Sequence, residues 1–145
     1  MTSYANDNRD KRIVKESTVN YRLELVAVPV SDVDVAKHFY ADMVGFTLDH
    51  DHTVSDDLRF VQLTPPGSAC SISIGKGLVE TAPGSAQGLQ LVVDNADDAR
   101  ADLAGRGVDV SDVQAFPWGR FVFFSDPDGN GWAVQEIPPR SSSAT

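Results

Sequence analysis

The sequence has few of the groups that mark several broad classes of protein. It contains one cysteine, Cys70, which excludes an internal disulfide and a zinc site built on several thiolates. No apolar run approaches the roughly 18 residues of a membrane-spanning helix, and the N-terminus lacks the apolar core of a secretory signal. Positive charge is also scarce, with 12 Lys and Arg against 21 Asp and Glu, a net charge of −9. We therefore expect no nucleic-acid or membrane partner, and a cytoplasmic location.

Two segments of the chain read alike at an offset of 63 residues (93 minus 30). Residues 30–36 (VSDVDVA) reappear loosely as residues 93–99 (VDNADDA). Each copy ends an apolar run, supplies an Asp or Asn that suits a helix N-cap, and opens a helical pattern that ends at a glycine, Gly45 or Gly107. A repeat of this length in so short a chain predicts two similar modules packed together.

Strand and helix signals alternate in the order βαβββ, twice over. Helices are expected over 33–43 and 96–103 from the apolar spacing. Strands are expected over 23–30, 46–50, 58–63 and 69–74 in the first module, and over 89–93, 108–110, 120–124 and 132–137 in the second. We predict one domain over 21–137, made of modules at about 21–78 and 87–137, with flexible tails at 1–20 and 138–145.

This layout resembles the vicinal oxygen chelate superfamily, which includes glyoxalases, bleomycin-resistance proteins and extradiol dioxygenases. The resemblance rests on residues 28–32 (VPVSD) running into 36–40 (AKHFY), on 93–95 (VDN) and on 126–130 (DPDGN). It implies an α+β fold of two tandem βαβββ modules that form an open curled sheet around a cleft. It also implies a homodimer, because many two-module relatives pair and share clefts. In metal-dependent relatives, His and Glu side chains hold a divalent ion in that cleft.

Four positions of this sequence match the metal ligands of those relatives. They are Leu25, Gln62, Gly88 and Ala133. Only Gln62 offers a donor oxygen, whereas a catalytic divalent ion usually needs at least three protein ligands. We therefore predict no metal and no other cofactor. A two-residue shift of the alignment would bring in Gln90 and Gln135, whose amides suit hydrogen bonds to a neutral polar ligand.

Aromatic and amide side chains are the predicted ligand contacts. Residues 117–121 (PWGRF) place rings and an arginine beside the last hairpin, which indicates either a cleft wall or core packing. The predicted ligand-binding residues are Gln62, Gln90, Gln135, Phe60, Trp118, Arg120 and Phe121. Glu136 has the opposite strand parity to Ala133 and Gln135, so it is expected to face away from the cleft.

The segment 49–52 (DHDH) is the one cluster of metal-ligand residue types. An exposed turn or strand end is its favoured interpretation. The alternative is a ligand-gating loop in which His50 or His52 acts as a general base, since both would share one face of an extended strand. The segment 126–130 lacks the ligand spacing of a calcium loop and is expected to be a turn.

Several functions remain open on this basis. The preferred one is a protein that binds a neutral or cationic small organic molecule in a metal-free cleft, as in bleomycin-resistance-like sequestration. The alternative is a metal-independent isomerase, lyase or cyclase acting on a natural-product-like substrate. Metal-dependent glyoxalase-like chemistry ranks last, and a plain interaction module is less attractive than a binding cleft. Whether the chain is an enzyme therefore stays open.

Overall fold

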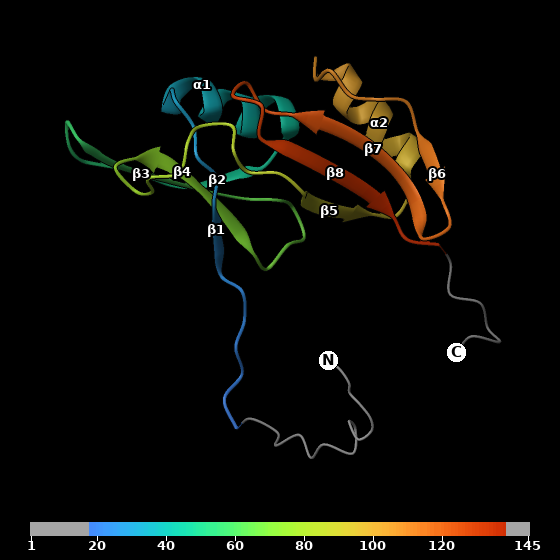
Figure 1. Cartoon of the computed structure of the whole chain (residues 1–145), viewed down its shortest axis with the longest axis horizontal. Coiled ribbons are helices and arrows are strands. Elements are labelled where there is room, and N and C mark those ends of the chain that lie inside the picture. The colour runs from blue at the N-terminus through green and yellow to red at the C-terminus, as the bar shows by residue number, and fades with distance from the viewer. Residues whose placement is uncertain (1–17, 139–145) are drawn as a thin grey trace.

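The computed structural model describes residues 18–138, which form two four-stranded sheets with both helices on one side (Figure 1). The first module contains β1 (Leu25–Ala27), α1 (Val33–His38), the π-helical turn η1 (Phe39–Val44), β2 (Thr47–Ser55), β3 (Leu58–Thr64) and β4 (Ser71–Lys76). The second contains β5 (Leu89–Val93), α2 (Ala96–Gly105), β6 (Gln114–Phe116), β7 (Gly119–Ser125) and β8 (Gly131–Glu136). The order β1-β4-β3-β2 is repeated as β5-β8-β7-β6, which confirms the predicted pair of βαβββ modules.

Some element bounds differ from the sequence prediction. The prediction of a strand over 108–110 is wrong, since the second strand of the second module is β6, which pairs with β7 from Gln114 onward. β2 continues past residue 50 to Ser55, because it stays paired with β3 along its whole length. The tail segments 1–17 and 139–145 lie outside the described residues.

The predicted helix caps are confirmed. Asp32 Oδ1 accepts a hydrogen bond from the backbone N–H of Val35 at 3.1 Å, and Asn95 Oδ1 accepts one from Asp98 N–H at 2.8 Å. Both contacts satisfy an N–H that has no partner within its own helix. Gly45 ends η1 with φ of +92°, a left-handed conformation that suits glycine and turns the chain into β2.

A buried polar cluster joins the two modules. The Tyr40 hydroxyl donates to Asp126 Oδ2 at 2.7 Å and accepts from Trp132 Nε1 at 2.9 Å. Asn130 Nδ2 donates to Asp126 Oδ2 at 2.8 Å and to the Pro29 carbonyl at 2.7 Å. We call these five residues the inter-module latch, because Pro29 and Tyr40 come from the first module and the other three from the second. Each side chain has its partners despite nearly complete burial, as low-dielectric surroundings require.

The segment 126–130 therefore does more than turn the chain. Besides placing Asp126 and Asn130 in the latch, it puts the Asp128 carboxylate against Ser31, which donates from its N–H at 3.0 Å and from its hydroxyl at 2.6 Å. Burial raises the pKa of Tyr40 above its usual range, and the negative charge of Asp126 raises it further. Tyr40 therefore stays protonated at neutral pH and keeps its hydrogen-bond donor for Asp126.

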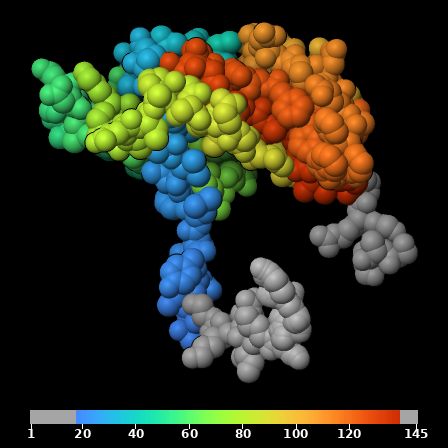
Figure 2. Space-filling view, viewed as in Figure 1, coloured from blue at the N-terminus to red at the C-terminus, as the bar shows by residue number. Residues whose placement is uncertain are grey.

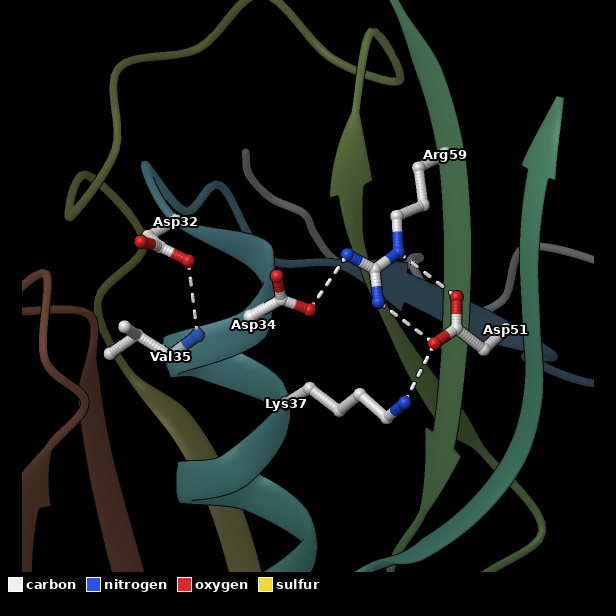
Figure 3. Close-up of polar contacts among 6 residues, drawn as sticks. All are labelled: Asp32, Asp34, Val35, Lys37, Asp51 and Arg59. Carbon is white, nitrogen blue, oxygen red and sulfur yellow. Dashed lines mark hydrogen bonds and ion pairs between the residues drawn. The ribbon is translucent and has the colours of Figure 1, made fainter. Parts of the chain in front are cut away.

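An ion-pair network fastens α1 to the first sheet (Figure 3). Arg59 of β3 donates from Nε and Nη2 to the two oxygens of Asp51 on β2, at 3.0 and 2.8 Å. It also donates from Nη1 to Asp34 of α1 at 2.9 Å, and Lys37 of α1 donates to Asp51 at 2.7 Å. The hydrogen bonds from Arg59 and Lys37 hold the pKa of Asp51 well below its usual range. The network marks the side of the first sheet that faces the helix.

This network predicts an acid-dependent loss of stability. Below about pH 4 the unfolded chain takes up a proton at Asp51 that the folded chain does not, so the free energy of unfolding falls as the pH is lowered. Asp51→Asn is expected to lower the free energy of unfolding by about 1–2 kcal/mol at pH 7 and to make its decline between pH 5 and pH 2 shallower. Urea unfolding across that range measures both effects.

The matched control is Asp112→Asn. Asp112 pairs with Arg100 at 3.0 Å, but its side chain is 92% exposed, so solvent screens the pair. Asp112→Asn is therefore expected to keep the wild-type pH dependence. If both variants show the same dependence of the free energy of unfolding on pH, the ion-pair network does not cause the loss of stability between pH 5 and pH 2.

Candidate ligand-binding face

Each sheet has one side covered by a helix and one open side. In the second sheet, Val122 and Val134 are buried beneath α2, whereas their neighbours along the strands point the other way. Residues paired across strands share a side, so the register fixes which side chains lie together. The open side of this sheet, with the β6–β7 turn, carries Gln90, Val92, Phe116, Trp118, Phe121, Phe123, Ala133 and Gln135. We call this set the aromatic face.

Four rings on the aromatic face contact one another in a row that we call the ring stack, made of two stacked pairs joined by one edge-to-face contact. Trp118 lies over Phe116 with centroids 5.4 Å apart and planes at 11°. Phe116 meets the edge of Phe121 at 5.7 Å, and Phe121 lies parallel to Phe123 at 5.8 Å. Phe121 is buried, but Trp118 is 62% exposed and Phe123 37% exposed, so the outer rings present aromatic surface to solvent. Such a surface can hold a flat organic molecule by stacking.

A chain of amides borders the rings. Gln90 Nε2 donates to Gln135 Oε1 at 2.5 Å, and Gln135 Nε2 donates to the Trp118 carbonyl at 2.9 Å. These two bonds fix both side chains beside the ring stack. Within residues 18–138, Gln90 Oε1 receives no hydrogen bond from the protein, which leaves it as an acceptor for an N–H or O–H group of a ligand.

A hollow of about 280 Å³ opens at the end of the aromatic face where β5 and β8 begin. Gly88, Phe123 and Ala133 are among its lining residues. Gly88 has φ of +79° and leaves open space where a side chain would stand. Two of the four positions that match family metal ligands thus border a hollow without contributing a donor atom.

The other two metal-matched positions lie on the first sheet. Leu25 is apolar, and the Gln62 amide donates to Ser71 Oγ at 3.2 Å. No cluster of three or more His, Cys, Asp and Glu side chains that could hold a metal ion occurs among residues 18–138. The residues at these positions do not fit a catalytic metal ion.

The remaining candidates are divided between the two sheets. Phe60, Gln62, His50 and His52 lie on the open side of the first sheet, where β2 and β3 pair His52 with Phe60 and His50 with Gln62. The two imidazoles stack with centroids 5.7 Å apart and are exposed, but they lie within β2 and not in the turn or strand end that was expected. Neither ring is hydrogen-bonded to a carboxylate within the described residues, so no acid–base pair is formed there.

Arg120 lies on the opposite side of its strand from Phe121. Its guanidinium donates to Asp97 of α2 at 2.9 Å and to Glu136 at 3.2 Å, and the hydrogen bond with Asp97 raises its pKa. Arg120 therefore connects β7 to α2 on the helix-facing side of the sheet and does not reach the aromatic face. Glu136 lies on the same helix-facing side, as its parity predicts. Sequence reasoning missed Phe116 and Phe123, although Phe123 follows Phe121 at the period of two that marks one side of a strand.

Comparisons with known proteins agree with this architecture. The model of the Glyoxalase/Bleomycin resistance protein/Dioxygenase superfamily matches residues 22–134. The crystal structure of TnmS3, an antibiotic-binding protein from Streptomyces sp. CB03234, is 37% identical with a TM-score of 0.75, over 84% of this chain and 99% of that chain. A member of the same superfamily from Sphaerobacter thermophilus DSM 20745 is 31% identical with a TM-score of 0.71, over 82% of this chain and 98% of that chain.

One curated relative is also similar in sequence. The uncharacterized protein YetH of Bacillus subtilis (strain 168) is 29% identical over 116 residues, which is 77% of this chain and 94% of YetH. Separately, none of the helices within residues 18–138 has the length and apolar character needed to cross a membrane.

Proposed function

Because the chain belongs to the glyoxalase/bleomycin resistance protein/dioxygenase superfamily, we propose that it binds a flat organic molecule on its aromatic face, without a metal ion and without breaking a bond. The similarity to TnmS3 supports this, since that protein is an antibiotic-binding protein. We further propose that the binding protein is a cytoplasmic homodimer. Its role is then sequestration, in which affinity alone removes the molecule from solution.

The exposed ring stack is the observation that carries this proposal. Side chains of this size are normally buried, and three of the four rings, Phe116, Trp118 and Phe123, are more than a third exposed around the buried Phe121. An exposed aromatic patch of this kind marks a binding surface. The Gln90 acceptor and the net charge of −9 favour a neutral or cationic ligand with an N–H donor over an anion. The hollow beside Ala133 gives a substituent of the ligand room to enter.

Two enzymatic alternatives are less well supported. A metal-independent isomerase, lyase or cyclase needs a general acid or base beside its substrate, and His50 and His52 lie on the other sheet without an orienting carboxylate. Metal-dependent glyoxalase-like chemistry needs ligands that Leu25, Gly88 and Ala133 cannot provide.

Titration with proflavine, a flat tricyclic cation, tests the proposed site. We expect saturable binding that quenches tryptophan fluorescence, unchanged after treatment of the protein with EDTA. Fluorescein, a flat anion of related ring size, is the matched control and is expected to bind at least ten times more weakly. Native mass spectrometry of protein purified without chelator is expected to show no stoichiometric metal. Stoichiometric divalent metal, or loss of proflavine binding in EDTA, would refute the metal-free site.

A further inference from the structure

A second hollow lies at one end of the first sheet and shares no residue with the aromatic face. It has a volume of about 430 Å³ and opens between the loop that joins β1 to α1 and the linker over residues 77–88, which joins β4 to β5. Figure 2 shows this linker, coloured yellow-green, passing beside the blue end of β1. We call the hollow the linker pocket. Its volume lies within the range of pockets that hold small organic molecules.

The linker pocket forms because β1 ends before its neighbour β4. The last backbone hydrogen bond between the two segments runs from Val28 N–H to the Ser73 carbonyl at 2.9 Å. β4 continues to Lys76, so its end has no strand beside it on that edge. The linker crosses the gap and is held to the β1–α1 loop by a hydrogen bond from Gly84 N–H to the Pro29 carbonyl at 3.2 Å. Backbone hydrogen bonds therefore fix both walls of the pocket.

A buried hydroxyl group without a partner lies in the wall of the linker pocket. Ser73 is 3% exposed, and its hydroxyl forms no hydrogen bond with any residue between 18 and 138. Ser71, two positions earlier on β4, is buried to the same degree, but its hydroxyl is bonded to Gln62 at 3.2 Å and to Thr64 at 2.6 Å. Buried polar side chains normally have a partner. The Ser73 hydroxyl therefore indicates a bound molecule that brings a polar group into the pocket.

The charges around the linker pocket have both signs. Lys76 is exposed and forms no ion pair within the described part of the chain. Asp32 caps α1 through Oδ1, which leaves Oδ2 available as an acceptor. Arg59 also lines the pocket, but its guanidinium is already bonded to Asp34 and Asp51. One cation and one carboxylate are thus available, and together they suit a ligand that carries both an anionic and a cationic group.

The rest of the pocket wall is largely aliphatic. Its apolar side chains are Ala27, Val28, Pro29, Val30, Val33, Leu78, Val79 and Pro83. No aromatic ring is among the lining residues, in contrast to the aromatic face. The pocket therefore suits an aliphatic group better than a flat aromatic molecule.

We propose that the linker pocket binds an aliphatic α-amino acid. The carboxylate of the amino acid lies toward Lys76, its ammonium group lies toward Asp32, and its side chain contacts the aliphatic wall. The Ser73 hydroxyl supplies a further hydrogen bond to one of the two polar groups. Because the ligand is a zwitterion, the net charge of −9 does not oppose its binding. This site does not depend on the proposed function, which concerns the other sheet.

NMR titration of ¹⁵N-labelled full-length protein with L-leucine tests the site. We expect saturable changes in the chemical shifts of backbone amides over residues 27–33 and 73–81. The matched control ligands are isoamylamine, which lacks the carboxylate, and 4-methylpentanoate, which lacks the ammonium group. Each is expected to bind at least ten times more weakly. No saturable change at any soluble concentration of L-leucine, changes confined to other residues, or equal binding of either control ligand would overturn the proposal.

Two variants test the roles of the polar side chains. Lys76→Gln is expected to weaken L-leucine binding at least tenfold and to leave isoamylamine binding within about twofold, because only leucine carries the carboxylate. Ser73→Ala is expected to weaken L-leucine binding by about threefold to tenfold. The matched control, Arg22→Gln, removes another exposed cation far from the pocket and is expected to leave the affinity within about twofold. Unchanged leucine affinity in Lys76→Gln would contradict the proposal.

Proflavine binding by the same variants separates the two sites. Lys76→Gln and Ser73→Ala are expected to bind proflavine with wild-type affinity, because neither residue lies on the aromatic face. Weaker proflavine binding in either variant would show that the two sites are not separate. A protein that binds L-leucine as expected but not proflavine would contradict only the proposed function, and the reverse result would contradict only the linker-pocket site.

Discussion

Asn130→Ala is expected to lower the free energy of unfolding by about 3–5 kcal/mol. The Asn130 amide donates to Pro29 and Asp126, and its oxygen accepts from the backbone N–H of Ala86 at 2.9 Å. Alanine would leave all three groups without that partner at a fully buried position, and each unsatisfied polar group costs about 1–3 kcal/mol. Urea unfolding followed by circular dichroism measures the loss, with an unchanged slope against urea concentration indicating the same folded state.

Asn95→Ala is the matched control for this variant. Unlike Asn130, Asn95 lies at an exposed site, where it caps α2 by accepting one hydrogen bond from the backbone N–H of Asp98. Loss of such a cap costs about 1 kcal/mol. If the two variants are equally destabilised, the inter-module latch is no more than an ordinary turn.

Trp118→Ala is expected to weaken proflavine binding by about tenfold to a hundredfold, which corresponds to about 1.4–2.8 kcal/mol. The substitution removes the outermost ring of the stack and the surface that it presents to the ligand. Because Trp118 is 62% exposed, stability is expected to change by less than about 0.5 kcal/mol. Changes in proflavine anisotropy measure the affinity in this variant, which has lost one of its two tryptophans.

Two substitutions separate stacking from general apolarity. Trp118→Phe keeps an aromatic ring over Phe116 and is expected to bind proflavine within about threefold of wild type. Val54→Ala removes a comparably exposed apolar side chain from β2, far along the chain from the aromatic face, and is expected to have no effect. Wild-type affinity in Trp118→Ala would place the ligand somewhere other than the aromatic face.

The repeated architecture was predictable because its signals are local. The cap residues Asp32 and Asn95, the apolar spacing that follows them and the glycine that ends η1 each act within a few positions. The prediction of a strand over 108–110 was wrong for a non-local reason. Those residues form a short apolar run, but the strand lies at Gln114–Phe116, where the chain pairs with β7. The length of β2 was likewise set by its partner β3.

The candidate site was predictable only in part. Residue type pointed to Trp118, Gln90 and Gln135, which the structure places on one surface. Residue type also pointed to Arg120, which the structure places on the other side of the sheet. Its orientation follows from strand parity and from its acidic partner Asp97 in α2. The latch was missed entirely, because nothing in the residues around Asp126 indicates that Tyr40 lies against them in the fold.

The inter-module latch also constrains how the chain is made. Tyr40 and Asp126 are separated by 86 positions, and Pro29 and Asn130 by 101. The first half of the protein therefore emerges from the ribosome well before the second-module residues of the inter-module latch have been translated. During that interval Tyr40 has no carboxylate to bond and Phe46 lacks the Trp132 ring that covers it in the finished fold. Nascent chains of this protein thus expose an aggregation-prone surface whose lifetime is set by the rate of translation.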